Sequence, residues 1–406
     1  MTINAATRDF IKQHLNDDVR RIALSKFPDD VDKTLVLNQI EAWQILSKKV
    51  PSWASNPDLL FSKHLSIEQC SSELTAKYKA SIVEKGEVFV DLTGGLGIDS
   101  YFLSEKFKIS YYVENQKELC DLAEHNFGVL GRKITVDNSD AESFLKQNHN
   151  FDLIFVDPAR RDIYNRKMVS LHDCSPDVVD LQNNLLKNAK NVLIKASPML
   201  DISLIINELM NVKEIHVVAV KNECKEVLIK IEPGFCGETR FTCVDLRQDL
   251  QDIFPVISTE AMRSEKISFK FTEFEEKTAI PTFATTIQKY LYEPNATLMK
   301  AGAFKLVSER FGIDKLHINS HLYTSDKMIA DFPGRVFEVV SCAPFGKKVK
   351  RELLKDVAEA SVVTRNFPLS ANELRKSLSL KESDKNFVFG TTMAGEKKVL
   401  VLCKKI

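Results

Sequence analysis

Apolar positions in the first 80 residues recur about every 3.6 residues, which is the spacing of one face of an α-helix. The pattern predicts helices at 10–15, 18–27, 32–50 and, after a serine N-cap, 71–85. Two prolines punctuate residues 51–58, which favours a loop there. We therefore expect residues 1–80 to form an N-terminal helical region.

From residue 87 short apolar runs alternate with helical stretches. Such runs are typical of strands buried on both faces, and the helices between them indicate a mostly parallel sheet. Seven runs occur, at 88–92, 109–114, 133–137, 151–157, 191–196, 214–220 and 227–233. Too few residues separate the last two for a crossover, so they should pair antiparallel. We expect an α/β domain at 81–235 whose sheet has seven strands, the last one antiparallel.

Shorter elements and turn signals follow Gly234. They include apolar runs at 239–246, 266–271, 334–341 and 397–405 and helical patterns at 296–312 and 347–360. We expect a small α+β C-terminal region made of two modules. One is an α+β module at 236–330, for which a ferredoxin-like arrangement is one option, and the other is a basic domain at 331–406.

Composition excludes several classes of protein. Of the 406 residues, 44% are hydrophobic and 28% are charged, as in a folded globular protein. No apolar run approaches the ~20 residues of a membrane helix, and the polar first residues do not resemble a secretory signal. Eight cysteines without a C-x-x-C pair favour reduced thiols and a cytoplasmic location over a disulfide or zinc framework.

Charge is balanced overall, with 56 basic and 56 acidic residues, but it is unevenly distributed. Residues 341–406 carry 14 Lys and Arg against 7 Asp and Glu, an excess of 7 positive charges. A basic module of this kind suits a polyanion such as RNA. The alternative is an ordinary solvated face of a small domain.

A glycine-rich turn follows the first predicted strand in the order Asp91, Leu92, Thr93, Gly94, Gly95, Leu96, Gly97. A strand, a glycine turn and a helix bring free backbone N–H groups to a ligand. A dinucleotide site would want a third glycine where Ser100 stands, and no carboxylate at the position of Asp91. A carboxylate there suits a cationic ligand such as the methionine part of S-adenosylmethionine. The alternative is a tight turn beside a surface acid.

Two further acidic positions follow the next strands. Glu114 and Asn115 end the second strand, where a carboxylate can accept the hydroxyls of a ribose. Asp140 and Ala141 follow the third strand, where a side chain can bind an adenine amine, although Asp140 can equally cap the next helix. The fourth strand ends in Asp157-Pro158-Ala159-Arg160-Arg161.

Together these stretches resemble a bacterial class I S-adenosylmethionine-dependent methyltransferase with a THUMP-like C-terminal domain, a relative of RNA-modifying enzymes. The resemblance covers residues 65–406 through SIEQCSSELTAKYKA, DLTGGLGIDS, FVDPARRD, IKASPMLD, YEPNATLMKAGAF and TRNFPLSANELRKSL. It implies a Rossmann-like methyltransferase sheet. It also implies that Asp157 faces the transferred methyl. The cofactor contacts that it implies are Asp91, Gly94, Gly95, Gly97, Glu114 and Asp140.

The Asp157-Pro158 pair suits amine chemistry, because a carboxylate and a backbone carbonyl can orient an N–H group toward a methyl donor. Amine methyltransferases usually continue with a second proline and an aromatic residue, but Ala159 and Arg160 stand here. Arg160 and Arg161 can stack on a base or bind a phosphate, or else pair with acids of the first helix. Tyr164 can replace the missing aromatic platform.

Other candidates lie near the same edge of the sheet. The segment 68–73 resembles one that covers the methionine end of the cofactor in cap-type guanine methyltransferases, or else it is a helix cap. Lys195 and Ser197 end the fifth strand and can contact substrate, or else form a structural turn. We expect no metal site, since no acid or cysteine pattern completes the pair His317 and His321.

The favoured hypothesis is an S-adenosylmethionine-dependent methyltransferase that modifies a base nitrogen in RNA, which the basic C-terminal domain would bind. One alternative is a small-molecule or protein methyltransferase. Another is an RNA-binding protein with a degenerate, inactive centre, suggested by Ala159 and Arg160. Neither a membrane nor a metal is an expected partner, and the oligomeric state is left open.

Overall fold

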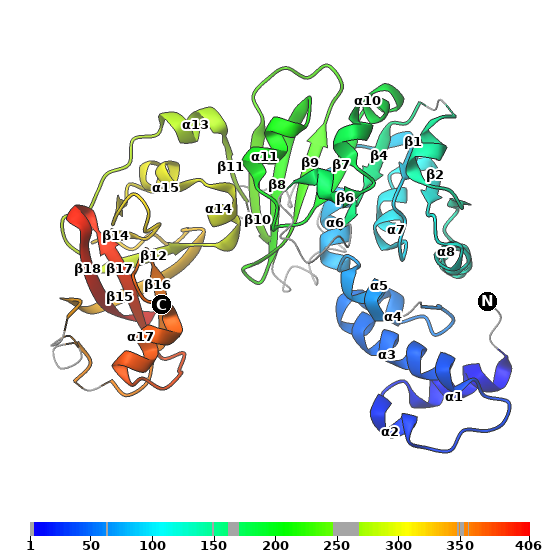
Figure 1. Ribbon diagram of the computed structural model, residues 1–406, viewed down its shortest axis with the longest axis horizontal. Coiled ribbons are helices and arrows are strands. Elements are labelled where there is room, and N and C mark those ends of the chain that lie inside the picture. Colours follow the sequence, from blue (N-terminus) through cyan, green and yellow to red (C-terminus); the bar gives the residue numbers. More distant parts are fainter. Residues whose placement is uncertain are drawn as a thin grey trace. The chain divides into compact units, whose positions relative to one another are not determined.

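The computed structural model describes residues 4–61, 64–147, 150–160, 170–246, 268–346, 349, 353–355 and 357–406; the side chains of 64–66 and 160 are also left out. The chain divides into two compact units (Figure 1). The first unit comprises Met1–Ile215, Glu226–Gly237 and Leu246–Met262, and the second comprises His216–Lys225, Glu238–Asp245 and Arg263–Ile406. The predicted four-part division stays a prediction. No helix in the described ranges has the length and apolar character needed to cross a membrane.

The first unit begins with the predicted helical region. Its helices are α1 (Ala5–His14), α2 (Val19–Ala23), α3 (Lys33–Lys49), α4 (Pro51–Ala54), α5 (His64–Gln69) and α6 (Glu73–Ser81). The side chains of Asn4, Asp18, Asp32 and Ser72 accept a backbone N–H as N-caps of α1, α2, α3 and α6. The loop expected at 51–58 begins instead with the short helix α4, because a proline is well suited to the first helical position.

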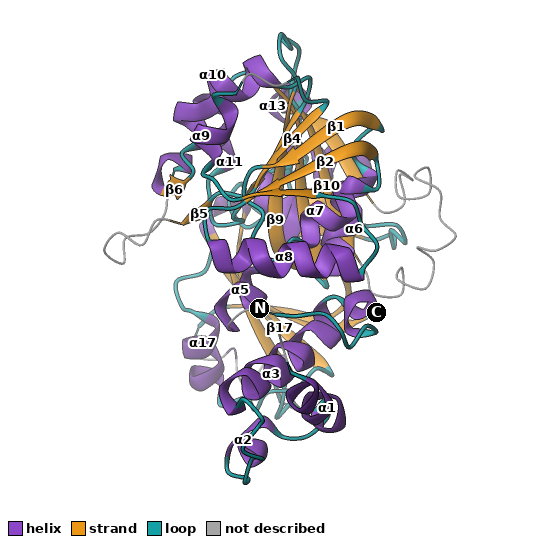
Figure 2. Cartoon of the chain, turned by 90° about the vertical axis from the view of Figure 1, so that its right-hand side faces the viewer, coloured by secondary structure: helices purple, strands orange, loops and turns teal. Residues whose placement is uncertain are grey.

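Five parallel strands form the centre of the first unit. They are β1 (Gly86–Asp91), β2 (Phe107–Val113), β3 (Thr135–Asp137), β4 (Leu153–Val156) and β7 (Val192–Ala196). The connecting helices are α7 (Ile98–Ser104), α8 (Lys117–Val129), α9 (Ala141–Leu145), α10 (Val178–Asn188) and α11 (Ile202–Glu208). Figure 2 shows α9, α10 and α11 on one side of the strands and α6 and α7 on the other. Because both faces are covered, β4 is buried at every residue and β7 at all but Lys195, while β1 and β2 are buried over their last residues, where the apolar runs predicted buried strands.

The reversed strand is confirmed: β9 (Glu223–Ile231) pairs antiparallel with β7. It follows β8 (Val212–Val220) after a two-residue turn in which Lys221 and Asn222 have φ of 53° and 62°. The sheet has nine strands in the order β11-β10-β8-β9-β7-β4-β1-β2-β3, not the seven expected. The extra strands are β10 (Arg240–Leu246) and β11 (Ser268–Thr272), which pair antiparallel. Their sequence pattern marks them as strands but does not say which sheet they join, because pairing is a long-range choice.

Between β4 and α10 the described part of the chain has a small antiparallel sheet of β5 (Ala159–Arg160) and β6 (Cys174–Ser175). A 3-10 helix, η1 (Leu171–Asp173), precedes β6. β5 follows directly after the Asp157-Pro158 pair.

The second unit contains a seven-stranded sheet in the order β13-β14-β12-β15-β18-β17-β16. Its strands are β12 (Tyr290–Pro294), β13 (Asp314–Lys315), β14 (Tyr323–Ser325), β15 (Gly334–Pro344), β16 (Ser361–Arg365), β17 (Asn386–Met393) and β18 (Lys397–Lys405). The helices are α13 (Glu273–Thr278), α14 (Ala296–Ala301), α15 (Phe304–Phe311) and α17 (Ala371–Leu378), with a 3-10 helix, η3 (Ala394–Glu396), before β18.

Two expectations for this unit need correction or completion. The single helix expected at 296–312 is divided into α14 and α15, because Gly302 adopts a left-handed φ of 78° that ends the first helix. The module boundary expected at 330 stays a prediction, and the strands on either side of it, β12 and β15, pair antiparallel in one sheet. Six of the 14 residues of the helix expected at 347–360 lie outside the described residues.

Candidate cofactor and substrate site

A cavity of about 590 Å³ lies in the first unit at the carboxyl ends of β1, β2, β3 and β4. This is the edge at which open α/β sheets bind their ligands. The lining brings together most of the residues predicted from the sequence: Asp91, Thr93, Gly94, Gly95, Gly97, Glu114, Asn115, Asp140, Ala141 and Asp157. The segment before α6 also contributes, through Gln69, Cys70 and Ser71.

Asp91 is 1% exposed, and its carboxylate braces the glycine-rich turn. Oδ1 accepts the backbone N–H of Thr93 at 2.9 Å, and Oδ2 accepts the hydroxyl of Ser100 at 2.5 Å. Burial raises the pKa of Asp91 to about 7, against the effect of these hydrogen bonds. Ser100 stands where a dinucleotide motif has its third glycine. Its hydroxyl holds the carboxylate of Asp91, which stands where a dinucleotide site would place the pyrophosphate.

Two glycines of the turn are required because aromatic rings of β2 and α8 pack directly against them. A Cβ on Gly94 would lie 2.1 Å from the ring of Tyr112. Gly97 has a φ of +77°, and a Cβ there would lie 2.7 Å from Phe127. The hydroxyl of Tyr112 also donates to the carbonyl of Gly95 at 2.5 Å. The aromatic residues of β2 and α8 thus hold the turn in the shape that forms the cavity floor.

Glu114 is fixed by two backbone donors. Its Oε2 accepts the N–H of Gly95 at 3.1 Å, and its Oε1 accepts the N–H of Gln116 at 2.9 Å. Each carboxylate oxygen has a further lone pair, so the group can still accept hydroxyl donors from a ligand. This geometry fits the expected contact with a ribose.

Asp140 caps a helix, as one of the two interpretations of the sequence expected, and its contact with an adenine stays a prediction. It is the N-cap of α9, and its oxygens accept the N–H and the hydroxyl of Ser143 at 2.7 and 2.8 Å. These bonds lower the pKa of Asp140. Because the residue also lines the cavity, the cap orients the carboxylate at the site.

Asp157 is positioned from two sides. Its backbone N–H donates to the hydroxyl of Thr93 at 2.6 Å, and its Oδ2 accepts the ammonium of Lys195 at 2.5 Å. Burial disfavours the charge on Lys195, but nearby carboxylates, Asp157 first, raise its pKa above the ordinary value. Lys195 does not line the cavity, so it acts on Asp157 rather than on the cavity directly.

A buried network of charges that reaches the cavity lining through Asp99 was not predicted. Lys79 of α6 is fully buried, and its ammonium lies 2.7 Å from Glu226 and 3.3 Å from Asp99. Ser71 donates to Asp99 at 2.6 Å, and Asp99 lies 4.0 Å from Lys195. Burial raises the pKa of Glu226. The one sequence signal was a carboxylate directly before an apolar strand run, at Glu226.

The two interpretations of the segment 68–73 apply to different residues. Ser72 is the N-cap of α6 and accepts the N–H of Thr75 at 3.2 Å. Ser71, by contrast, bonds Asp99 and lines the cavity. Glu73 accepts the N–H of Ser52 at 2.9 Å, which joins the segment to α4.

Several predicted site residues are not brought into the cavity. Pro158 is absent from its lining, and Ser197 accepts the N–H of Met199 at 3.3 Å, as a structural turn would. Arg161 and Tyr164 lie outside the described residues, as does the side chain of Arg160. Their proposed contacts with substrate stay predictions.

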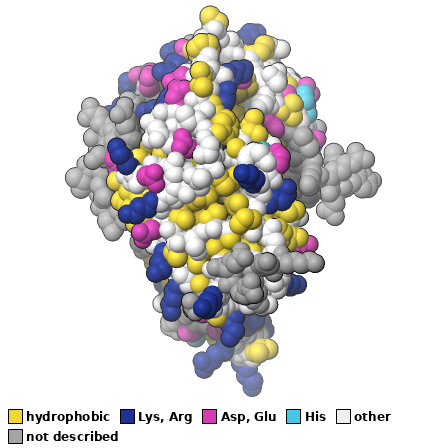
Figure 3. Space-filling model, turned by 90° about the vertical axis from the view of Figure 1, so that its left-hand side faces the viewer, with side chains coloured by type: hydrophobic (Ala, Val, Ile, Leu, Met, Phe, Trp, Pro, Cys, Tyr) yellow, Lys and Arg dark blue, Asp and Glu magenta, His cyan; other side chains and the backbone are white. Residues whose placement is uncertain are grey.

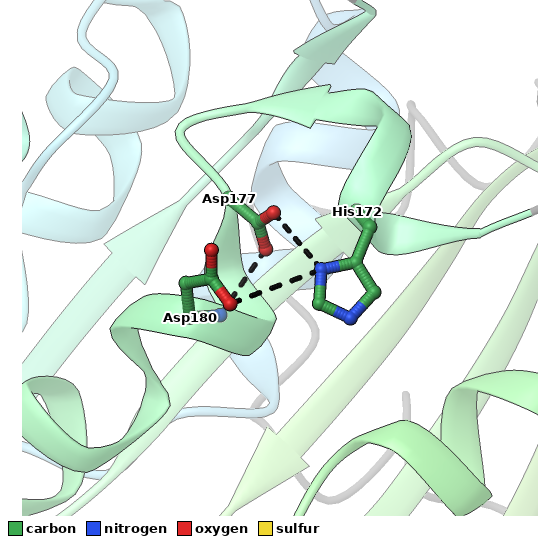
Figure 4. A group of neighbouring side chains, drawn as sticks. All are labelled: His172, Asp177 and Asp180. Atoms are coloured by element: carbon green, nitrogen blue, oxygen red, sulfur yellow. Dashed lines mark hydrogen bonds and ion pairs between the residues drawn. The ribbon is translucent and has the colours of Figure 1, made fainter.

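Among the described residues, one group has three side chains that could hold a metal: His172, Asp177 and Asp180 (Figure 4). His172 Nδ1 lies 2.9 Å from Asp177 and 4.0 Å from Asp180. Asp177 is also the N-cap of α10, which accounts for its place there. His317 and His321 have separate partners, since His317 contacts Glu396 at 3.0 Å and His321 stacks on Phe304.

Comparisons with known proteins place the chain in a family. A ferredoxin-like domain model matches residues 290–333, and a THUMP-like domain model matches residues 334–405. Over its whole length the chain is similar to a crystal structure described as a candidate methyltransferase from Porphyromonas gingivalis W83. The two are 35% identical, the alignment covers 100% of each chain, and the TM-score is 0.85.

Two further structures align over part of the chain. One is a candidate methyltransferase from Streptococcus mutans in complex with SAH, with 14% identity, 39% and 96% of the two chains covered and a TM-score of 0.30. The other is an rRNA methylase from Streptococcus thermophilus, with 13% identity, 39% and 94% covered and a TM-score of 0.29. Scores this low carry no argument about function. No curated protein matches the chain.

The match over the full length agrees with the sheet order, the reversed strand β9 and the cavity at the strand ends. The chain therefore belongs to the family of class I methyltransferases that the Porphyromonas gingivalis protein represents, with a THUMP-like domain at its C-terminal end.

Proposed function

We propose that the protein is an S-adenosylmethionine-dependent methyltransferase that modifies a base nitrogen in RNA. One observation carries the proposal: Asp91, Glu114 and Asp157, from three different strand ends, line one cavity. Its volume of about 590 Å³ lies within the range of small-molecule sites.

The donor set fits this cofactor better than a dinucleotide. Glu114 would accept the ribose hydroxyls, and Asp140 with Ala141 would lie beside the adenine. Asp91 and the segment 69–71 would surround the methionine end, where carboxylates favour a cation over a pyrophosphate. When bound, the cofactor supplies an electrophilic methyl group on a positively charged sulfur.

Asp157 would orient the substrate nitrogen. Lys195 donates to Oδ2, so Oδ1 and the backbone carbonyl of Asp157 are the acceptors that the lysine leaves open to a substrate N–H. The ion pair holds the carboxylate in one rotamer, which makes orientation the main contribution of these residues. Catalytic roles for Pro158 and Arg160, and substrate contacts from Arg161, Tyr164 and Ser197, remain part of the proposal.

RNA is the proposed substrate because of the C-terminal region. The match to a THUMP-like domain and the excess of 7 positive charges at 341–406 both favour a polyanion. Figure 3 shows one face of the molecule, on which Lys and Arg side chains are interspersed with acidic and hydrophobic ones. We place the activity in the cytoplasm, in keeping with eight free thiols.

A calorimetric titration with S-adenosylhomocysteine tests the cofactor. We expect binding by the wild type, binding at least ~10-fold weaker for Glu114→Gln, and unchanged binding for the exposed Glu118→Gln on the same side of the sheet. Equal affinity of all three proteins for S-adenosylhomocysteine would contradict the assignment of Glu114 to the cofactor site.

Transfer of labelled methyl groups to total RNA from a strain that lacks the protein tests the substrate. Transfer to an RNA fraction, lost in Asp157→Ala, supports the proposal. Transfer to a metabolite or a protein instead would favour the alternative methyltransferase. RNA binding with no transfer, unchanged by Asp157→Ala, would favour an inactive centre.

A further inference from the structure

The second unit contains a carboxylate that is shared by two arginines. Glu293 at the end of β12 is 3% exposed. Arg335 is its register partner on β15 and donates from Nε to Oε2 at 2.8 Å, while Arg365 at the end of β16 donates from Nη2 to Oε1 at 2.8 Å. Glu293 can neutralise only one of the two guanidinium charges.

Two more basic side chains lie in the same surroundings. Lys315 is 2% exposed, and its ammonium donates to the carbonyl of Ile318 at 2.6 Å and lies 3.4 Å from Nδ1 of His321. Burial first, and then the charges of Lys315 and Arg365, lower the pKa of His321 to about 4. Nδ2 of Asn366, the residue after Arg365, lies 3.0 Å from Nδ1 of His317, so the end of β16 lies against the segment that contains His321. The His321 ring stacks on Phe304, with 3.6 Å between centroids.

The positive charge of this cluster exceeds its negative charge. Burial lowers the pKa of Lys315 to about 8, so the ammonium stays largely charged at neutral pH. Glu276 is the acid that raises this pKa, and its two oxygens also accept the backbone N–H groups of residues 304, 305 and 306. Three cations thus face two carboxylates, Glu293 and Glu276, which leaves an excess of one positive charge.

The cluster also has an unused donor. Nε of Arg365 is buried and has no hydrogen-bond partner among the described residues. Buried donors are normally satisfied, and buried charges are normally paired. The arginine side chains are 34% and 38% exposed, so the guanidinium groups remain open to solvent and to a ligand.

We propose that Arg335, Arg365, Lys315 and His321 form a binding site for a phosphate group of RNA. An arginine fork matches two phosphate oxygens, and a phosphate would supply the missing negative charge. The choice of RNA over free phosphate rests on the proposed function. The site draws its residues from both matched domains. β12 and β13 fall within the ferredoxin-like match, and β15 and β16 fall within the THUMP-like match.

Two variants of the full-length protein test the site. Arg365→Lys keeps the charge but removes the fork, and Lys315→Met removes the buried ammonium that donates to the carbonyl of Ile318. Arg310→Gln is the matched control, because Arg310 is 33% exposed in the same unit and pairs with Glu275 at 2.8 Å. Circular dichroism establishes folding, and if one variant does not fold, the other decides.

The first measurement is the rise in melting temperature with inorganic phosphate. We expect a rise for the wild type and for Arg310→Gln, and its loss in Arg365→Lys and Lys315→Met. The second is the salt dependence of binding to a single-stranded RNA. We expect affinity to fall roughly 10-fold in the two site variants, and the slope of log K against log salt to decrease by about 1.

An unchanged phosphate response in both site variants would overturn the site. A lost phosphate response with an unchanged RNA slope would overturn RNA as the source of the phosphate. Titration of the same variants with S-adenosylhomocysteine separates this inference from the proposed function. If the variants bind S-adenosylhomocysteine normally and their RNA binding is unchanged, the phosphate site fails and the methyltransferase proposal stands. If the wild type does not bind S-adenosylhomocysteine but the variants lose RNA affinity, the methyltransferase proposal fails and the phosphate site stands.

Discussion

Lys195 and Asp157 form an ion pair at the edge of the cavity, with 2.5 Å between Nζ and Oδ2. Lys195 is 13% exposed and Asp157 is 35% exposed, so the lysine is covered while the acid reaches the cavity. We conclude that the lysine holds the orientation of the acid that would face the substrate.

Replacement of this lysine tests that role. In Lys195→Met we expect methyl transfer to fall by roughly 100-fold in kcat, because a misoriented group costs about this much. Affinity for S-adenosylhomocysteine should change little, since Lys195 does not line the cavity. The control is Lys190→Met, which removes an exposed ion pair to Asp152. A parallel loss of cofactor binding would argue against a positioning role.

The pKa of Asp91, raised to about 7 from 3.8, predicts a dependence of stability on pH. Between these values the folded protein binds a proton that the unfolded chain releases. Stability should therefore fall as pH rises from about 4 to about 7. In Asp91→Asn that contribution should disappear. Urea unfolding of both proteins across this range measures it, and parallel curves would contradict the prediction.

Gly97 and Gly128 offer a matched pair of alanine substitutions. Gly97→Ala should destabilise the protein by about 1–3 kcal/mol, because φ is +77° and the new Cβ would meet Phe127 at 2.7 Å. Gly128 lies in α8, and a Cβ added there would have no neighbouring atom within 4 Å, so Gly128→Ala should stabilise by about 0.5–1 kcal/mol. Chemical denaturation of both variants compares the signs, and equal effects would refute the argument.

The buried network predicts a rescue experiment. Lys79→Met leaves Glu226 without the ammonium that lies 2.7 Å from it, which should cost about 3–5 kcal/mol of folding free energy, while Asp99 keeps Lys195 at 4.0 Å. Adding Glu226→Gln removes this uncompensated charge, so the double variant should recover part of the loss. Thermal and urea unfolding of the single and double variants provide the test. A double variant less stable than Lys79→Met would show that charge is not the cause.

Local patterns were sufficient for most of the first unit. The alternation of apolar runs with helical stretches predicted the five parallel strands, and the short link between the last two runs predicted the reversed strand β9. The acids at the strand ends predicted the cavity wall, because parallel strands end at one edge. Each of these inferences depends only on residues close together in the chain.

Long-range pairing decided the rest. The pattern of β10 and β11 indicated strands, but only the tertiary structure assigned them to the nine-stranded sheet. In the same way it placed β12 and β15 in one sheet across the expected boundary at 330. Strands pair through backbone N–H and C=O groups, which are the same in every strand, so the sequence of a strand does not specify which strand lies next to it.

The sequence by itself thus determined which acids stand at the strand ends and which order of elements brings them there. Only the tertiary structure decided what each acid contacts: Ser100 for Asp91, Lys195 for Asp157 and Lys79 for Glu226. The physical reason is that charge pairing and burial depend on side chains from distant elements. Those elements meet only when the chain has folded.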